Sequence, residues 1–295
     1  MDSWNGSTLA LLLLACAALG AYATAAWPGT RAWQDTTLRA ACAMHGVVLL
    51  AHLLGLGAGG TLGRLGFAPV LSATVWLVLI VYVVESHFVP LRGARRVLAS
   101  MGLLSLPALL LFPGYGVIMH GAALWEPVHV ILAIAAYVLF GAAVLHAVLL
   151  NRSERAMRNA AVSWRLGDAA AAGSQAGGTM LPLLTLEKLT FRFVDLGFAV
   201  LSAALLLGWW FSSPWRWDHK TVFSLLAWAV FAALLLGRRL RGWRGRRATR
   251  WLYTGAVLLL LAYVGSRFVL EVLLHRPPPV VSMARSDLDA QDRRP

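Results

Sequence analysis

The run from Pro127 to Leu150 reads PVHVILAIAAYVLFGAAVLHAVLL and contains no Asp, Glu, Lys or Arg. A helix rises ~1.5 Å per residue, so a run of this length can cross the roughly 30 Å hydrocarbon layer of a bilayer. The run therefore predicts a membrane-spanning helix.

The rest of the chain has the composition of an integral membrane protein. Of its 295 residues, 59% are hydrophobic and 13% are charged, which is about half the charged fraction of an average soluble domain. The mean hydropathy is +0.69. Seven further runs are apolar enough to span, and the eight together predict an all-α, polytopic membrane bundle. The spans are expected at Thr8 to Trp27, Leu38 to Leu56, Phe67 to Val84, Val97 to Phe112, Pro127 to Leu150, Phe191 to Phe211, Thr221 to Gly237 and Trp251 to Leu274.

The placement of Arg and Lys predicts the orientation of the bundle. The segments Asn151 to Thr190 and Arg238 to Arg250 are rich in them, and such short basic loops stay on the cytoplasmic side during insertion. The loop Gly208 to Lys220 carries Arg216 offset by Asp218 and is expected on the periplasmic side. With eight spans, both termini are then periplasmic.

Several classes of protein are excluded or disfavoured. Cys16 and Cys42 both lie within apolar runs, so there is no disulfide framework, no redox pair and no motif for covalent haem attachment. The net charge of +13 is concentrated in short loops, which favours a topological role over nucleic-acid binding.

The domain organisation is expected to be simple. Residues 1–276 form one transmembrane domain, and residues 277–295, with three consecutive prolines and mixed charge, form a disordered tail. No basic residue precedes the first apolar run, so it is interpreted as a retained span and not as a cleaved signal peptide.

Histidines inside or beside the spans are the first candidate site residues. His45 and His52 are seven apart and share one helix face. Their imidazoles could line a cavity and ligate haem iron, or they could be packed polar residues that hold helices together. His129 follows Pro127 in the first turn of its span, which predicts an imidazole at the outer membrane surface. His120, His219 and His275 are expected on the same side.

A charged pair in the last span and a cluster of tryptophans in the periplasmic loop are not explained by membrane insertion alone. Arg267 and Glu271 are four apart in the last span, where they can form a salt bridge, or Arg267 could hold a carboxylate such as a haem propionate. Four tryptophans lie within nine residues of the periplasmic loop, and an interfacial belt does not require that density. The four tryptophans are Trp209, Trp210, Trp215 and Trp217. Flat aromatic surfaces beside charged groups suit a planar, amphipathic tetrapyrrole.

The loop and its neighbours resemble a known family. Trp215-Arg216-Trp217-Asp218-His219-Lys220, followed by Trp228 and Phe231, is similar to the tryptophan-rich WWD signature of the haem-handling membrane proteins of cytochrome c biogenesis, the CcsA, CcmC and CcmF group. The span before the loop, with Phe191-Arg192 and Gly197-Phe198, is similar too. The resemblance covers roughly Pro127 to Leu274. It implies haem presentation at the periplasmic face, with His129 as the ligand from that side.

Other segments resemble the compact, eight-span YpjD-like inner-membrane subgroup of this family. They are Leu181 to Lys188, Gly242 to Arg247 and Ala262 to Arg267, together with His45. The chain also departs from the family pattern. Leu234 to Gly237 stands where the CcsA pattern has a histidine, the second periplasmic histidine is matched only by the slightly offset His275, and large periplasmic insertions are missing.

The leading hypothesis is a haem-binding protein of the bacterial inner membrane that acts in cytochrome c assembly with other biogenesis components. Non-covalent, b-type haem would be bound and presented, with no nucleophile supplied by this chain. His129 is the expected axial ligand, with His275 or His219 as the second. Trp215, Trp217 and Asp218 would shape the platform, Arg267 would hold a propionate, and His45 with His52 would mark a second site or transit path. The alternatives are a scaffold or regulator of the same fold that has lost haem binding and, less favoured, a small-solute transporter.

Overall fold

The computed structural model describes residues 6–29, 33–56, 64–87, 94–116, 125–165, 183–211, 217–265 and 268. In these ranges the chain is helical, apart from short turns and a two-residue antiparallel ladder between β1 (Arg64–Leu65) and β2 (Tyr115–Gly116). The helices are α1 (Gly6–Ala26), α2 (Trp33–Leu53), α3 (Phe67–Glu85), α4 (Ala94–Leu111), α5 (Trp125–Arg165), α7 (Leu183–Phe211), α8 (His219–Arg241) and α9 (Gly245–Leu260), which continues into the π-helical segment η1 (Leu261–Gly265).

Eight of the described helices are long and apolar enough to cross a membrane, so the predicted all-α, eight-span bundle is confirmed. Large apolar side chains are exposed on the outside of these helices, among them Leu13, Leu104 and Leu206. A bilayer would cover such residues, because lipid tails are as apolar as leucine. The expected tail and the Ala/Gly-rich stretch at 168–178 lie outside the described residues.

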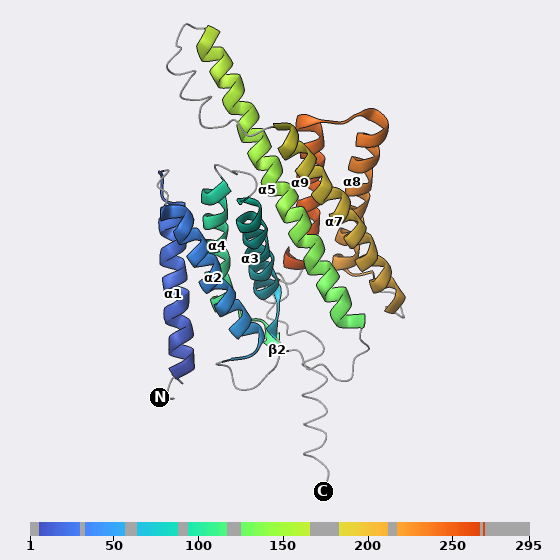
Figure 1. The fold of residues 1–295 in the computed structure, drawn as a ribbon. Helices are drawn as coiled ribbons and strands as arrows, with labels where there is room; N and C mark the ends of the chain where they lie inside the picture. The colour runs from blue at the N-terminus through green and yellow to red at the C-terminus, as the bar shows by residue number, and fades with distance from the viewer. Residues whose placement is uncertain are drawn as a thin grey trace.

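The helices pack as two groups joined along α3 and α5. Helices α1 to α4, with one face of α5, enclose one set of buried side chains that includes Tyr22, Leu79 and Leu145. Helices α5, α7, α8 and α9 enclose a second set around Phe140 and Phe231, whose rings stack with centroids 3.8 Å apart. Figure 1 shows α1 to α4 (blue to teal) on one side and α7 to α9 (yellow to orange) on the other, with α5 between them.

Two helices extend well beyond the expected apolar runs. Helix α5 has 41 residues and continues to Arg165, and α7 begins at Leu183, so much of the segment expected as a loop from Asn151 to Thr190 is helical. High hydropathy identifies only the part of a helix that lies within the membrane. Outside it, Ala-rich sequence and charge pairs such as Glu154 with Arg158 (3.7 Å, four residues apart) still favour the helix. Figure 1 shows the end of α5 protruding past the other helices.

Small residues allow close helix approach within the first group. A Cβ on Gly102 of α4 would lie 2.5 Å from the Tyr22 ring of α1, and one on Gly46 of α2 would lie 2.6 Å from the Trp76 ring of α3. In hydrocarbon there is no hydrophobic force between helices, and close van der Waals packing of this kind drives their association.

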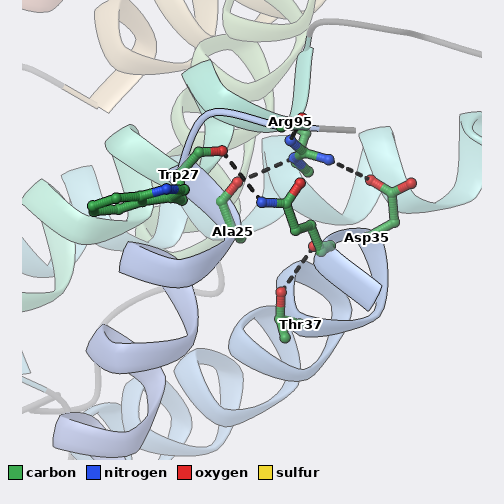
Figure 2. A network of polar contacts seen from close by, with 7 residues as sticks. Ala25, Trp27, Asp35, Thr37 and Arg95 are labelled. Carbon is green, nitrogen blue, oxygen red and sulfur yellow. Dashed lines mark hydrogen bonds and ion pairs between the residues drawn. The ribbon is translucent and has the colours of Figure 1, made fainter. Parts of the chain in front are cut away.

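Arg95, in the first turn of α4, joins three helices at one end of this group (Figure 2). Its Nε donates to the carbonyl of Ala25 (3.1 Å), and its Nη2 donates to that of Gly29 (2.6 Å). Its Nη1 lies 3.8 Å from the Asp35 carboxylate in the first turn of α2. The last carbonyls of a helix lack intrahelical partners and carry partial negative charge, so a guanidinium there is doubly favourable. Arg95 thus attaches both the end of α1 and the start of α2 to the first turn of α4.

Replacing Arg95 tests this junction. Arg95→Met keeps most of the apolar stem but removes the charge and the donors, and we expect it to lower the free energy of unfolding by about 2–3 kcal/mol. The measurement is equilibrium unfolding of the purified protein in mixed micelles. The matched control is Arg96→Met, which changes an exposed neighbour and should cost less than about 0.5 kcal/mol. Equal effects of the two changes would contradict the assignment.

Candidate functional site

The histidine expected at the outer end of its span, His129, is held by the backbone of α7. It lies near the start of α5, and its Nδ1 is 3.0 Å from the carbonyl oxygen of Ala204. The imidazole packs directly on Gly208, where a Cβ would be 3.0 Å from Cε1. A larger residue at position 208 would therefore push the ring out of this position.

The hydrogen bond to Ala204 defines the protonation of the ring. A carbonyl oxygen can only accept, so Nδ1 must carry the hydrogen, and in the neutral imidazole the lone pair is then on Nε2. Among the described residues, Nε2 makes no hydrogen bond, and the His129 side chain is half-buried. A backbone carbonyl on one nitrogen with the other nitrogen uncommitted is the usual arrangement of a metal-ligating histidine.

The tryptophan loop begins immediately beyond Gly208. Trp209 and Trp210 end α7 with 63% and 79% of their surface exposed, and Trp217, just before α8, is 73% exposed. Trp215 lies outside the described residues. These three tryptophans thus present exposed apolar rings at or after the end of α7, the helix whose backbone holds His129.

Asp218 caps α8. Its Oδ1 accepts hydrogen bonds from the backbone N–H of Thr221 (2.8 Å) and from the Thr221 hydroxyl (2.7 Å). Partial burial raises the pKa of the carboxyl, but these hydrogen bonds and the Lys220 and His219 charges outweigh burial, and the net pKa lies below its usual value. The carboxylate is therefore ionised at neutral pH and stabilises the start of the helix. This capping role was not expected from the sequence.

Lys220 brings a cation to the same region. Its Nζ lies 5.8 Å from the centre of the Tyr263 ring on η1, and it is close enough to His129 for the two to interact electrostatically. Arg267, the cation expected from the sequence, lies outside the described residues, as do Glu271, His120 and His275. His219 is exposed as the first residue of α8.

The last span changes helix type beside the site. At Leu261–Gly265 the α-helix becomes a π-helix, a rare form that is often found at functional sites. Tyr137, eight residues after His129 on α5, donates its hydroxyl to the carbonyl of Leu259 just before this segment. Hydrogen bonds from neighbouring helices of this kind stabilise irregular backbone at membrane depth.

Residues of the family-like segments pack the helices beneath the site. The Phe140 ring of α5 lies on Gly197 of α7, where a Cβ would be 3.2 Å away. Trp228 of α8 donates to the Ser202 hydroxyl of α7 (2.9 Å), and its ring stacks on Phe198 at 5.6 Å. These contacts hold α5, α7 and α8 in the arrangement that brings His129 to Gly208.

His45 lies in a different part of the bundle, with both ring nitrogens occupied. Its side chain is 0% exposed, its Nδ1 is 3.0 Å from the Tyr22 hydroxyl, and its Nε2 is 2.8 Å from the Ser72 hydroxyl. His52 has its Nε2 2.8 Å from the carbonyl of Pro113 at the end of α4. These contacts favour the interpretation of both histidines as packed polar residues that link helices.

The described residues contain no group of three or more His, Cys, Asp or Glu side chains that could hold a metal ion. The donor offered by His129 is a single imidazole. Such a donor suits a metal that brings its other ligands with it, as the iron of a porphyrin does. The residues present therefore fit a haem better than a bare ion.

The family follows from the sequence as a whole. The model of the cytochrome c assembly protein family matches residues 9–274. The chain belongs to this family. Among individual proteins, the cytochrome c biogenesis protein CcsA of Gloeobacter violaceus is 37% identical over 95 residues, which are 30% of this chain and 28% of that protein.

Other relatives match the chain over different lengths. CcsA of a Synechococcus strain is 32% identical over 157 residues, 48% of this chain and 50% of that protein. The inner membrane protein YpjD of Escherichia coli is 36% identical over 97 residues, 32% of this chain and 37% of that protein. The matched segments thus span half the length of these relatives or less. No solved structure matches the chain. The resemblance seen in the tryptophan loop is confirmed at the level of the family.

The cap at Asp218 gives a first test of the site. Asp218→Ala removes both bonds to Thr221, and we expect a loss of about 1 kcal/mol in stability and faster amide exchange in the first turn of α8. Asp218→Asn is the control, because its side-chain oxygen can still accept. If the Asn variant exchanged as fast as the Ala variant, the capping account would be wrong.

The buried histidine gives a second test. His45→Ala leaves the Tyr22 and Ser72 hydroxyls without their partner, so we expect a loss of about 2–4 kcal/mol in the free energy of unfolding. His52→Ala, which removes a single bond near the end of α2, should cost about 1 kcal/mol. Unfolding in mixed micelles measures both. A His45→Ala protein of unchanged stability would contradict the structural role.

Proposed function

We propose that the protein binds non-covalent haem at the periplasmic end of α5, α7 and α8, in the bacterial inner membrane, and presents it during cytochrome c assembly. The observation that carries the proposal is the state of His129. Its Nδ1 is committed to the Ala204 carbonyl, and Nε2 is the nitrogen left to ligate iron.

The neighbours of His129 support the same ligand. Haem is flat and apolar with two carboxylates at one edge, and it needs apolar surface together with a cation. The exposed rings of Trp209, Trp210 and Trp217 provide the surface, and Lys220 provides a charge for a propionate. Trp215 and Arg267 remain proposed members of this platform, and His275 or His219 remains the proposed second axial ligand.

The chain's own residues would bind and orient. When bound, haem would supply an iron that can take an imidazole ligand and redox chemistry of its own. Ala204 and Gly208 would fix the imidazole, and Asp218 would fix the start of α8 beside the loop. The cytochrome thiols would come from another component of the assembly machinery.

The orientation rests on charge. The arginine-rich turn between α8 and α9 and the basic segment after residue 150 favour the cytoplasm, which puts the opposite ends, including His129, at the periplasm. The printed name of the Escherichia coli relative, an inner membrane protein, agrees with this membrane.

A second candidate is a scaffold or regulator of the same fold that no longer binds haem. Leu234 and Leu235 favour it, because they occupy the part of α8 where the family pattern has a histidine. Both are buried in the apolar core of the second helix group, at 0% and 8% exposure. A ligand at that level would need a different side chain.

A visible spectrum separates the two candidates. In mild detergent, the purified wild type or the protein reconstituted with hemin should show a Soret band. His129→Ala should lose it, and added imidazole should restore part of it, because the ligand alone is missing. His87→Ala is the matched control, since His87 is an exposed histidine two residues after α3 whose Nδ1 bonds the Val83 carbonyl near the end of that helix. A colourless wild type that takes up no hemin would contradict haem binding and favour the scaffold.

A change at Gly208 tests the position of the imidazole without removing it. Gly208→Ala places a methyl group against the imidazole, so we expect haem affinity to fall about tenfold, the range for loss of support to a metal ligand. Gly265→Ala is a control, because the three atoms nearest to a Cβ there belong to the Leu261 side chain, the first at 3.1 Å, and not to a histidine. Hemin titration followed by absorbance measures both. Unchanged affinity of Gly208→Ala would show that the His129 position is not the one that binds.

A further inference from the structure

The turn between α8 and α9, residues 237–247, is built around a tryptophan that is folded back onto α8. Gly242 has φ 64°, and the backbone N–H of Trp243 donates to the carbonyl of Gly237 (3.3 Å). A Cβ on Gly237 would lie 2.5 Å from Cε3 of the indole, so only glycine allows this contact. The ring atoms nearest to that Cβ are Cε3, Cδ2 and Cζ3, so the six-membered part of the indole packs on Gly237.

Two buried donors in this turn have no acceptor among the described residues. Trp243 is 9% exposed and its Nε1 is buried without a hydrogen bond. The same holds for Nη1 of Arg238, whose guanidinium lies 3.4 Å from the centre of the Phe191 ring. Unpaired buried donors are costly, and a structure that keeps them invites an acceptor from outside.

The charge of the turn points to an anionic acceptor. Arg244, Arg246 and Arg247 are exposed, and the Arg247 guanidinium lies over the Trp243 ring at 4.3 Å. The nearest described carboxylate is that of Glu187, with Oε1 3.8 Å from Nε of Arg244. Helix α9 starts here without a side-chain cap, so its first N–H groups add to the positive potential. A second carboxylate, that of Asp195, lies 4.0 Å from Nη2 of Arg239. Two carboxylates cannot balance the six arginines between residues 238 and 247.

The position of the turn favours a lipid as the source of the anion. It connects two helices that are long and apolar enough to span a membrane. Leu236 and Leu240, four residues apart on α8, are exposed just before it. Acyl chains would cover such a face, and a turn that joins two spans would lie near the level of the lipid phosphates. Basic sites between helices at the cytoplasmic surface are suited to anionic head groups.

We propose that the α8–α9 turn binds the phosphate of an anionic phospholipid, with Arg244 and Arg247 as cations and the Trp243 indole N–H as a donor. The site is at the opposite end of α8 from the proposed haem platform, and it stands whether or not haem binds. Its role would be to hold the arginine-rich turn at the membrane surface.

Lipid retention by the full-length protein tests this site. Purified protein in detergent is titrated with phosphatidylglycerol or phosphatidylethanolamine, and bound lipid is counted by native mass spectrometry. We expect tighter binding of phosphatidylglycerol. Each of Arg244→Gln and Arg247→Gln should weaken it about fivefold. Trp243→Phe, which keeps a ring but removes the N–H, should also weaken it about fivefold.

The control separates a site from general attraction. The double variant Arg239→Gln with Arg241→Gln removes two charges from the end of α8 and should leave lipid affinity within about twofold, because these side chains lie outside the proposed ligand set. The matched double variant Arg244→Gln with Arg247→Gln should lose more affinity than either single change, and an equal loss in it and in the control would overturn the proposal. So would equal binding of the two lipids, or displacement of phosphatidylglycerol by millimolar inorganic phosphate, which would indicate a site for free phosphate.

Discussion

Inside a bilayer no water is present to satisfy a polar group, and this constraint governs most of what the chain does. The backbone satisfies itself by forming helices. Buried side chains follow the same rule: His45 bonds two hydroxyls, and Tyr137 bonds a backbone carbonyl of a neighbouring helix. A paired imidazole nitrogen in the core, such as those of His45, links helices. Nε2 of His129 lies at the edge of the bundle and is the nitrogen proposed to bind a ligand.

The number and type of spans were predictable because bilayer crossing requires long apolar runs, and the sequence has eight of them. Helix ends were less predictable. Helix α5 continues to Arg165 through Arg152 and Glu154, where hydropathy falls but helix propensity does not. The shared face of His45 and His52 was also visible in their spacing. The partners were not, since they come from residues 23, 27 and 61 positions away in the chain.

Part of the candidate site was also predictable, because some of its residue types are unusual in a membrane protein. His129 and the tryptophan loop stood out as residue types that a membrane does not explain, and Asp218 stood out within the family-like motif. The residues that hold His129 carry no such signal. Ala204 contributes only its backbone carbonyl, Gly208 contributes the absence of a side chain, and both depend on the packing of α5 against α7. Lys220 was visible in the motif, but its proximity to Tyr263 requires the last span to return to α8.

The length of α5 has a mechanical consequence. From His129 to Arg165 it is one uninterrupted helix, which at ~1.5 Å per residue is roughly 54 Å long. Its only proline, Pro127, lies in the first turn, so the rod has no proline hinge along its length. Contacts with neighbouring helices hold this rod from the bond of His129 to Ala204 of α7 as far as the bond of Asn151 to Tyr253 of α9. A helix without a hinge moves as one piece, so a displacement of the histidine end would be carried along the rod to its protruding end on the other side of the membrane.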